Sequence, residues 1–412
     1  MNLYAFTLGR KHLISIAELA HVIKDQGRIV DIQTETLIVD LTRPIENPQT
    51  FLDQLGGSIK LIQITKDLNG NPPQLADEIR DHFLASINHD DTKLIYGLSL
   101  YNFAQSSKNL LKNSLIFLKK NLSKEKIKSR FINKDFKNLT CTQLHHEKVL
   151  QNGLDFSIIK TAKTVYMGHT VAYQNFESYS KRDYNRPARD AKVGMLPPKL
   201  AQIMLNLADL RRPHEKKTIF DPFCGLGTII NEATLMGFNC VGSDLHEKMV
   251  ESSKKNLNWL YAQFPETPKR STHFFTKDAT QINKEDFAGN TIDAIVTESY
   301  LGPPQKKIPD NKEINKNFSH SKELLKRFLK QATKYLEKGA PIVITIPAYR
   351  QNKTIRKLSE FPEIVANSGY KILPLIPHQP ANQFKLHTEN SLIYDRNDQY
   401  VCREIYKIVK TV

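Results

Sequence analysis

Acidic residues follow four successive apolar runs in the second half of the chain. TIFD ends at Asp221, NCVGSD at Asp244, THFFTKD at Asp278 and TIDAIVTE at Glu298. If these runs are parallel strands, their carboxyl ends share one edge of a sheet, where ligands bind in such architectures. Carboxylates there can accept hydrogen bonds from the hydroxyl and amino groups of a ligand. We therefore expect the four acids to line one ligand site.

The first acid opens a glycine turn, Asp221-Pro-Phe-Cys-Gly-Leu-Gly-Thr. Gly225 and Gly227 remove side chains at a point where a ligand would touch the backbone. No lysine follows the glycines, which excludes a phosphate-binding P-loop, and the third glycine of the dinucleotide fingerprint is missing. The spacing from Asp221 to Asp244 suits an acid that reaches ribose hydroxyls. An NAD-dependent enzyme is therefore a distant alternative.

The elements that must position these residues alternate from Lys217 onward. Strand-like runs are separated by helical stretches, and the last two runs, NSLIYDR and QYVCREIYKIV, lie close together. This alternation predicts an α/β fold in which a mostly parallel, doubly wound sheet carries an antiparallel C-terminal hairpin.

The N-terminal part has a different order of predicted strands and helices. LYAFTLG, SIAELAHVIKDQG and RIVDIQTETLIVDL read as a strand, a helix and two strands, which is the βαββ pattern of a small α+β sandwich. From Lys93 to about Ala172 a mixed pattern returns and includes a basic helix over 106–122. Residues 175–198 are polar, aromatic and charged and read as a linker before the helix KLAQIMLNLA.

The chain length, the apolar runs and the positions of the cysteines restrict the class of protein. A chain of 412 residues is long for one core, so two or three domains are expected. No apolar run approaches the roughly 20 residues that a membrane span needs, and the N-terminus does not resemble a signal peptide. The four cysteines lie far apart, so neither a disulfide framework nor a structural zinc site is expected. We expect a cytoplasmic protein without a metal centre.

Positive charge is concentrated before residue 150. The formal net charge is +16, and KEKIKSRFINKDFK holds six basic residues against two acids. The six are Lys124, Lys126, Lys128, Arg130, Lys134 and Lys137. Such a run attracts polyanions and favours a nucleic-acid footprint, with a solvated basic surface as the alternative.

Taken together, these motifs resemble known enzymes. DPFCGLGTIINEA, GSD and the loop after TIDAIVTE are similar to class I S-adenosylmethionine-dependent methyltransferases. With RPARDAKVGMLPPKLAQIMLNLA, the ending YDRNDQYVCREI and the opening LYAFTLGRKHLISIAELAHVI, the chain resembles the THUMP-containing tRNA guanine-N2 methyltransferases of the guanosine-10 type. The resemblance implies a ferredoxin-like domain over 1–60, a THUMP-like RNA-binding domain over 61–172, a linker over 173–195 and a methyltransferase domain over 196–412.

The resemblance also implies roles for the acids. Asp221, Gly225 and Gly227 would hold the methionine part of S-adenosylmethionine. Asp244 would accept hydrogen bonds from the ribose hydroxyls, and Asp278 would accept one from the adenine amino group.

The loop after the fourth strand departs from the pattern of the family. Relatives carry Asp-Pro-Pro-Tyr or Asn-Pro-Pro-Tyr there, whereas this chain has Glu298-Ser-Tyr300-Leu. An amine acceptor must be held in line with the methyl donor while a group accepts a hydrogen bond from its N–H. The alignment gives this role to Glu298 and base stacking to Tyr300. A catalytically dead site is the alternative.

The resemblance makes tRNA the expected partner. The six basic residues of 124–137 would then contact phosphates. Arg182, Arg186 and Arg189, interleaved with Tyr179 and Tyr184, would either contact RNA or hold the linker to the methyltransferase domain through Asp183 and Asp190. A monomer is expected, and the need for a small activator subunit stays open. Alternative functions are methylation of another amino group in tRNA, rRNA or DNA, or RNA binding without catalysis.

Overall fold

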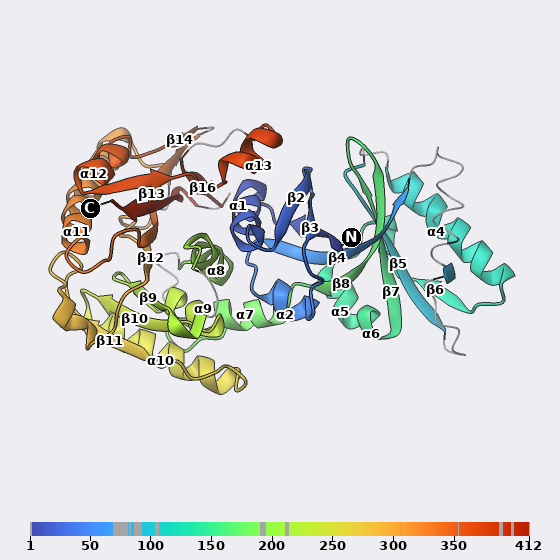
Figure 1. The fold of residues 1–412 in the computed structure, drawn as a ribbon, viewed down its shortest axis with the longest axis horizontal. Coiled ribbons are helices and arrows are strands. Elements are labelled where there is room, and N and C mark those ends of the chain that lie inside the picture. Colours follow the sequence, from blue (N-terminus) through green and yellow to red (C-terminus); the bar gives the residue numbers. More distant parts are fainter. Residues whose placement is uncertain are drawn as a thin grey trace. The chain divides into compact units, whose positions relative to one another are not determined.

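The computed structural model describes residues 2–68, 81, 84–85, 93–103, 107–189, 195–210, 214–305, 307–352, 354–386, 390–396 and 399–411. The chain forms two compact units (Figure 1). The first consists of Met1–Ile16 and Ile23–Phe176, and the second consists of Ala17–Val22 and Glu177–Val412. Among the described residues, none of the helices has an apolar stretch long enough to span a bilayer.

The N-terminal unit is built on one eight-stranded sheet, in the order β2-β3-β1-β4-β8-β7-β5-β6. Its strands are β1 (Asn2–Leu8), β2 (Gly27–Ile32), β3 (Thr36–Leu41), β4 (Ser58–Leu68), β5 (Leu94–Tyr101), β6 (Ser129–Phe131), β7 (Gly153–Lys160) and β8 (Val165–Tyr173). Its helices include α2 (Pro48–Asp53), α4 (Ser107–Lys124), α5 (Cys141–His146) and α6 (Val149–Asn152), and helix α1 (His12–Ile23) is divided between the two units. The strands and helices predicted for 1–65 and 93–173 are confirmed. Because β4 pairs with both β1 and β8, the sheet continues across residue 60, where the sequence suggested a domain boundary.

Helix α4 shows how the basic segment is attached. Its apolar residues Leu111, Leu115, Leu118 and Leu122 recur every three or four positions and are buried against the sheet. This is the spacing of one helix face, and Lys112 and Lys120, which lie between these leucines in the sequence, are exposed. The Lys112 ammonium lies over the ring of Phe136, 5.5 Å from its centre. Burial of the leucines thus fixes the helix that leads into the basic run.

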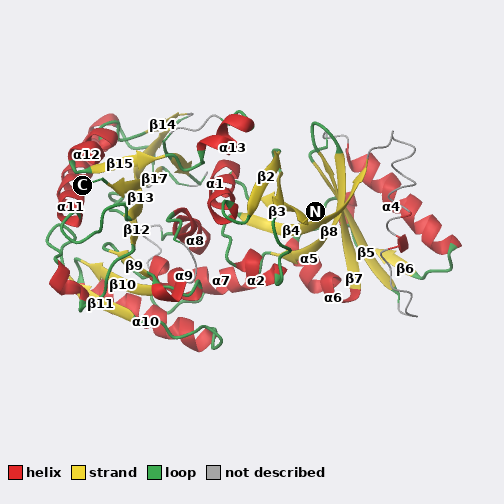
Figure 2. Ribbon diagram, in the orientation of Figure 1, coloured by secondary structure: helices red, strands yellow, loops and turns green. Residues whose placement is uncertain are grey.

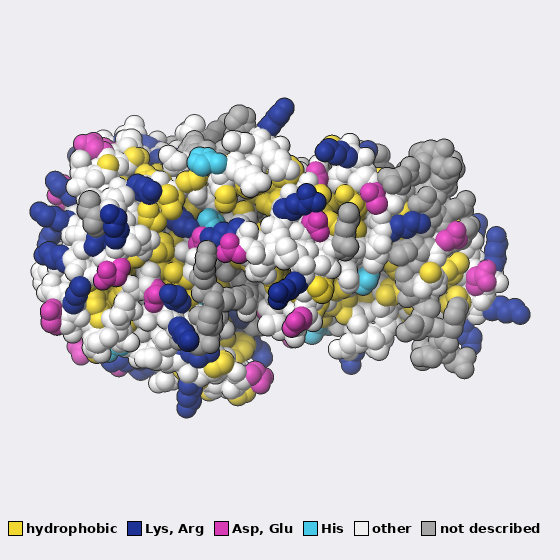
Figure 3. Space-filling view, in the orientation of Figure 1, with side chains coloured by type: hydrophobic (Ala, Val, Ile, Leu, Met, Phe, Trp, Pro, Cys, Tyr) yellow, Lys and Arg dark blue, Asp and Glu magenta, His cyan; other side chains and the backbone are white. Residues whose placement is uncertain are grey.

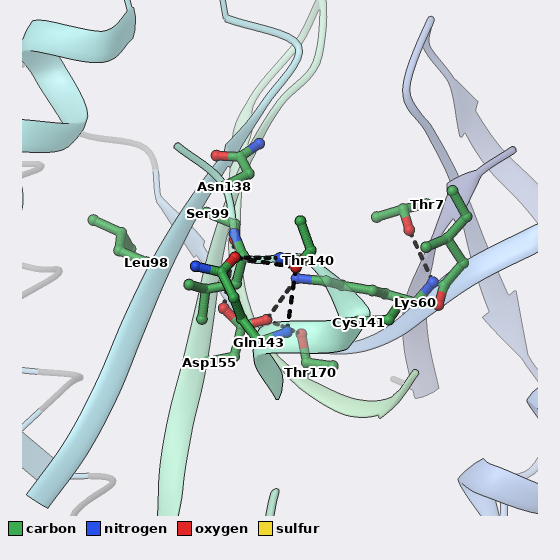
Figure 4. A network of polar contacts seen from close by, with 12 residues as sticks. Thr7, Lys60, Leu98, Ser99, Asn138, Thr140, Cys141, Gln143, Asp155 and Thr170 are labelled. Carbon is green, nitrogen blue, oxygen red and sulfur yellow. Dashed lines mark hydrogen bonds and ion pairs between the residues drawn. The ribbon is translucent and has the colours of Figure 1, made fainter. Parts of the chain in front are cut away.

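A buried ion pair joins the two halves of this sheet (Figure 4). Lys60 on β4 donates to Asp155 on β7 across 2.8 Å, and both side chains are almost fully buried. Thr170 also donates to the Asp155 carboxylate, at 2.7 Å. Burial, the largest single effect, lowers the pKa of the Lys60 ammonium, but the charges of Asp155 and Tyr101 and the hydrogen bond to Asp155 together raise it. Lys60 therefore stays charged inside the core.

The second unit contains a nine-stranded sheet whose main path is β11-β10-β9-β12-β13-β17-β15 (Figure 2). Its strands are β9 (Thr218–Asp221), β10 (Asn239–Asp244), β11 (Thr272–Thr276), β12 (Ala294–Glu298), β13 (Pro341–Gln351), β14 (Thr354–Arg356), β15 (Tyr370–Leu373), β16 (Leu392–Tyr394) and β17 (Val401–Lys410). Its helices include α7 (Phe176–Tyr184), α8 (Pro198–Leu207), α9 (Thr228–Leu235), α10 (Glu247–Gln263), α11 (Asn311–Ala332), α12 (Phe361–Asn367) and α13 (His378–Gln383).

Parallel pairing brings four strand ends to one edge of this sheet. β11, β10, β9, β12 and β13 are parallel neighbours, so the loops after β9, β10, β11 and β12 leave the sheet at the same side. The predicted doubly wound sheet is confirmed, as is the C-terminal hairpin of β16 with β17. In addition, β17 runs antiparallel between β13 and β15. This insertion places residues from the end of the chain beside β13, one strand from the edge of the main path.

A buried hydrophobic core on one face of the sheet holds the strands that end at this edge. Phe220 of β9 and Ile295 of β12 pack with Leu325 and Phe328 of α11 and with Phe361 of α12. These side chains are fully buried. A close-packed core of this kind allows little shift of the strands, so the residues at the strand ends keep their spacing.

Candidate active site

Asp221 lies at the end of β9 and is 2% exposed. Its Oδ1 accepts a hydrogen bond from the Thr297 hydroxyl at 2.6 Å and one from the Phe223 amide at 3.2 Å. Burial raises the pKa of this carboxyl to about 7, against those hydrogen bonds and with help from the charges of Asp244 and Glu298. The structure thus brings Asp244 and Glu298 within electrostatic reach of Asp221.

The two glycines after Asp221 differ in what a side chain at each position would contact. Both have positive φ, +50° at Gly225 and +77° at Gly227. A Cβ on Gly227 would lie 2.1 Å from the Ser253 Oγ of α10, so this glycine permits close helix packing. Of the described residues, only Phe223 would lie within 4 Å of a Cβ on Gly225, through its carbonyl oxygen at 3.9 Å. Among these residues, the backbone at Gly225 therefore borders open space.

Asp244 and Asp278 lie at the ends of the next two strands and are half-buried. Asp244 ties the glycine turn to β10, because its Oδ2 accepts the Gly225 amide at 3.0 Å while its Oδ1 accepts the His246 amide. Asp278 Oδ1 accepts the Thr280 amide at 2.8 Å. The carboxyl ends of β10 and β11 are joined by the Lys277 amide, which donates to the Asp244 carbonyl. All four acids therefore lie along one edge, as their spacing predicted.

Glu298, at the end of β12, has a partner that the sequence did not reveal. Its Oε1 accepts from Arg403 Nε at 2.5 Å. Arg403 belongs to β17 and is 3% exposed, whereas the Glu298 side chain is 21% exposed. The sequence signal for this partner is weak, because Arg403 is one of three charged residues, with Glu404 and Lys407, in the strand-like run QYVCREIYKIV. Glu298 is thus an anchored carboxylate with part of its surface open.

The residues after Glu298 form a fixed loop. Both the amide and the hydroxyl of Ser299 donate to the Thr345 carbonyl, at 3.1 and 2.8 Å. The Tyr349 hydroxyl donates to the Leu301 carbonyl at 3.1 Å. Tyr300 is 48% exposed, and its ring meets His320 of α11 edge to face. The loop therefore holds Glu298 and presents an aromatic ring beside it.

The linker arginines are held by the second unit. Arg182 is buried on α7 and donates to Glu232 of α9 at 2.8 Å. Arg186 is 3% exposed and donates to the Thr228 hydroxyl at 2.6 Å. Of the two alternatives for these side chains, RNA contact or a hold on the linker, their enclosed guanidinium groups favour the second. They hold the linker, but through Glu232 and Thr228.

The same segment continues over the glycine turn. The Ala188 amide donates to Asn256 Oδ1 at 2.9 Å, and Asn256 donates back to the carbonyls of Ala188 and Leu226. The Arg189 guanidinium lies over the Tyr184 ring. The predicted partner Asp190 lies outside the described residues. Residues 182–188 are therefore part of the wall around the Asp221 turn.

The six basic residues of 124–137 are all exposed. They lie at the end of α4, on and around β6 and in the following turn; Arg130 pairs with Glu147 across 2.6 Å. Lysine and arginine side chains are scattered over the face of the molecule shown in Figure 3. The structure leaves these six side chains accessible, and their contact with RNA stays a prediction.

The chain is similar to known methyltransferases. Residues 185–370 match a family model described as "RMKL-like, methyltransferase domain", and residues 81–255 match one described as "DNA methylase". A protein named tRNA (guanine(10)-N2)-dimethyltransferase from Pyrococcus abyssi is 36% identical over 138 residues, which are 33% of this chain and 36% of that protein. A protein of the same name from Methanothermobacter thermautotrophicus is 31% identical over 157 residues, 38% of this chain and 40% of its own length. The matched segments thus span less than half of these relatives.

The fold has a counterpart over the whole chain. The crystal structure of TrmN from Thermus thermophilus aligns with a TM-score of 0.52 and 14% identity and covers 99% of both chains. At this identity the likeness concerns the fold alone. The strand order with its inserted antiparallel β17, the acidic edge and the family match over 185–370 lead to one conclusion. The C-terminal unit has the fold of class I methyltransferases, and residues 185–370 are similar to the RMKL-like methyltransferase domain.

Proposed function

We propose that this chain uses S-adenosylmethionine to methylate the exocyclic N2 amine of a guanosine in tRNA, with position 10 as the expected site. The observation that carries the proposal is the gathering of Asp221, Asp244 and Glu298 around the glycine turn at the edge of a methyltransferase sheet. The guanine-N2 substrate rests on the names of the archaeal relatives.

The residues present fit the cofactor. The described residues leave open space at Gly225, where the methionine chain could lie against the backbone. Buried Asp221 supplies negative charge next to a cationic group, and the half-buried carboxylates of Asp244 and Asp278 suit ribose hydroxyls and an adenine amino group. When bound, S-adenosylmethionine supplies an electrophilic methyl group on a sulfonium. The chain contributes the binding, orientation and enclosure of that group.

Glu298 and Tyr300 would hold the guanine. The exposed part of the Glu298 carboxylate accepts a hydrogen bond from the target N–H as the nitrogen becomes pyramidal. The exposed ring of Tyr300 stacks on the base after the nucleotide has left its helix. Both residues belong to a loop that is already fixed, so the base is oriented with little rearrangement.

We propose that the N-terminal unit docks the tRNA. Residues 1–60 would be the ferredoxin-like part, residues 61–172 the THUMP-like part and 173–195 the linker to the catalytic domain 196–412. Lys124, Lys126, Lys128, Arg130, Lys134 and Lys137 would contact phosphates, since all six are exposed. A tRNA substrate agrees with a cytoplasmic enzyme, for which we propose a monomer; a small activator subunit is a separate question.

A second candidate substrate is DNA, because residues 81–255 match a family described as DNA methylase. That match ends before the loop of Glu298, so it does not bear on the choice of base. The two substrates are separated by one experiment. Labelled S-adenosylmethionine is incubated with unmodified tRNA, rRNA or duplex DNA, and the product nucleosides are mapped. N2-methylated guanosine in tRNA supports the proposal, and label only in DNA or no label at all contradicts it.

The role of Glu298 is tested in the same assay. Glu298→Ala should lower turnover about 100- to 1,000-fold, because the variant cannot form the hydrogen bond that strengthens during the reaction. Cofactor binding, measured by calorimetry, should be unchanged. Glu323→Ala removes an exposed acid of α11 and serves as the charge-matched control. Wild-type turnover in the Glu298 variant would show that this carboxylate has no part in the reaction.

A further inference from the structure

The ion pair between Glu298 and Arg403 has an unusual construction. Arg403 is separated from Glu298 by more than a hundred residues of sequence and by one strand in the sheet. β12 pairs with β13, and β13 pairs with β17, so Arg403 approaches from the strand beyond the neighbour of Glu298. A contact across an intervening strand requires a long side chain that lies along the sheet surface.

The register explains how the ion pair is made. Glu298 pairs with Thr345, and Thr345 pairs with Ile405, so the side chains of all three lie on the same face. Arg403 is two residues from Ile405 on the same strand and therefore shares that face. Its backbone is opposite Pro347 of β13, nearer to the carboxyl edge. From there its guanidinium crosses β13 to reach Glu298.

Arg403 is fixed from two sides. On one side it is in register with Pro347 of β13, and on the other with Tyr394 of β16. Two residues that flank this part of the sheet are also held, because Arg350 pairs with Asp395 and the Arg350 amide donates to the Tyr400 carbonyl at 2.8 Å. The base of the arginine side chain therefore has little freedom.

The charges at the edge favour a cation in this place. The charges of Asp244 and Glu298 both act on Asp221. A buried arginine is costly to desolvate unless it is paired, and here it pairs with an acid that keeps part of its surface open. Glutamate also has one more rotatable bond than aspartate, so a free Glu298 would sample several orientations.

We propose that Arg403 is a positioning residue for catalysis: its Nε–H holds one oxygen of Glu298 so that the carboxylate faces the incoming amine. This inference rests on the proposed function, in which Glu298 accepts the hydrogen bond from that amine. Without the pair, the carboxylate swings away from the line of attack and turnover falls. The affinity for the cofactor does not change.

The test compares Arg403→Ala and Arg403→Lys with wild type in the tRNA methylation assay. Arg403→Ala lowers kcat about 100-fold, the expected effect of a misplaced reacting group, and leaves the cofactor dissociation constant unchanged. Arg403→Lys keeps the charge but not the Nε–H geometry, so its kcat lies between those of Arg403→Ala and wild type. Added guanidinium or ethylguanidinium restores part of the kcat of Arg403→Ala.

The matched control is Lys407→Ala, which removes another buried cation from the same face of β17, paired with Asp209. It keeps wild-type kcat and does not respond to guanidinium.

A double variant supplies the second criterion. If the two residues act as one unit, Glu298→Gln combined with Arg403→Ala is no slower than Glu298→Gln alone. Additive decreases in kcat, or wild-type kcat in a folded Arg403→Ala protein that binds the cofactor, overturn the proposal. Absence of rescue by guanidinium also counts against it.

Failure of the proposed function gives a different result. In that case wild type transfers no methyl group to guanosine, and the pairing is followed through hydrogen exchange of the Arg403 Nε–H by NMR. Slow exchange in wild type that becomes fast in Glu298→Gln supports the orienting contact. Equal exchange rates in the two proteins overturn it.

Discussion

At the scale of single residues, the site is defined by one carboxyl that folding makes difficult to ionise. Asp221 is enclosed below the glycine turn, and its pKa of about 7 comes mainly from burial. A cation placed at the turn would favour the charged form. The ligand-free protein therefore holds a carboxyl whose negative charge a cationic ligand can stabilise.

The pH dependence of the free energy of unfolding tests whether burial raises the pKa of Asp221. From about pH 4 to pH 7 folded Asp221 keeps a proton that the unfolded chain releases, so the free energy of unfolding falls as pH rises in that window. Each unit of the shift corresponds to about 1.4 kcal/mol. Asp221→Asn cannot ionise, so it should flatten this slope, raise ligand-free stability at pH 8 and weaken cofactor binding.

Urea unfolding from pH 4.5 to 8 measures the effect, and Glu323→Gln provides an exposed-acid control. Parallel stability curves for wild type and Asp221→Asn would rule out a perturbed Asp221.

At the scale of elements, charged residues inside strands join distant parts of the chain. Arg403 connects β17 with β12, and Lys60 connects β4 with β7. In both pairs the cation is almost fully buried. A buried pair is costly to disrupt from one side only, because the remaining charge has no partner. Such pairs specify which strands come together.

The Lys60 pair provides a stability test. Lys60→Met should reduce the free energy of unfolding by about 3–5 kcal/mol, since it leaves Asp155 buried without its cation. Lys60→Met combined with Asp155→Leu should recover most of this stability, because no uncompensated charge remains. Urea denaturation of wild type, the single variant and the double variant measures these free energies of unfolding. Equal destabilisation of the single and double variants would mean that packing of the lysine chain, and not its charge, is what matters.

At the scale of the whole molecule, the net charge of +16 favours association with polyanions at many places on the surface. Basic side chains are spread over the face in Figure 3, so total charge alone does not define a binding surface. What distinguishes the run 124–137 is six exposed basic residues on consecutive, well-anchored elements. If tRNA binds at this run, removing its charges should change the salt dependence of tRNA binding more than removing the same number of charges elsewhere on the surface.

Changing Lys124, Lys126, Lys128 and Lys134 to Gln should weaken tRNA binding and reduce the slope of log K against log[salt] by about 0.7–0.9 per phosphate that the variant no longer neutralises. The control changes the exposed lysines Lys216, Lys334, Lys338 and Lys371, near the amino edge of the C-terminal sheet, for an equal change in charge. Filter binding at several salt concentrations gives both slopes. An equal effect of the two sets would show that only total charge matters.

The sequence by itself determined the elements of this protein and the order of its acids. Local periodicity sufficed for β9 to β13, and the glycine turn marked the ligand edge, because a strand's alternation and a turn's positive φ are properties of neighbouring residues. Glu298 was found in the same way, as the last residue of an apolar run.

Only the tertiary structure decided what these residues contact. Arg403 meets Glu298, Thr297 meets Asp221, and Arg182 is enclosed beside Glu232. The sheet of the N-terminal unit also continues through residue 60. Each of these contacts joins positions far apart in the chain, and pairing of distant strands depends on the whole packed sheet. No local pattern of residue types encodes it.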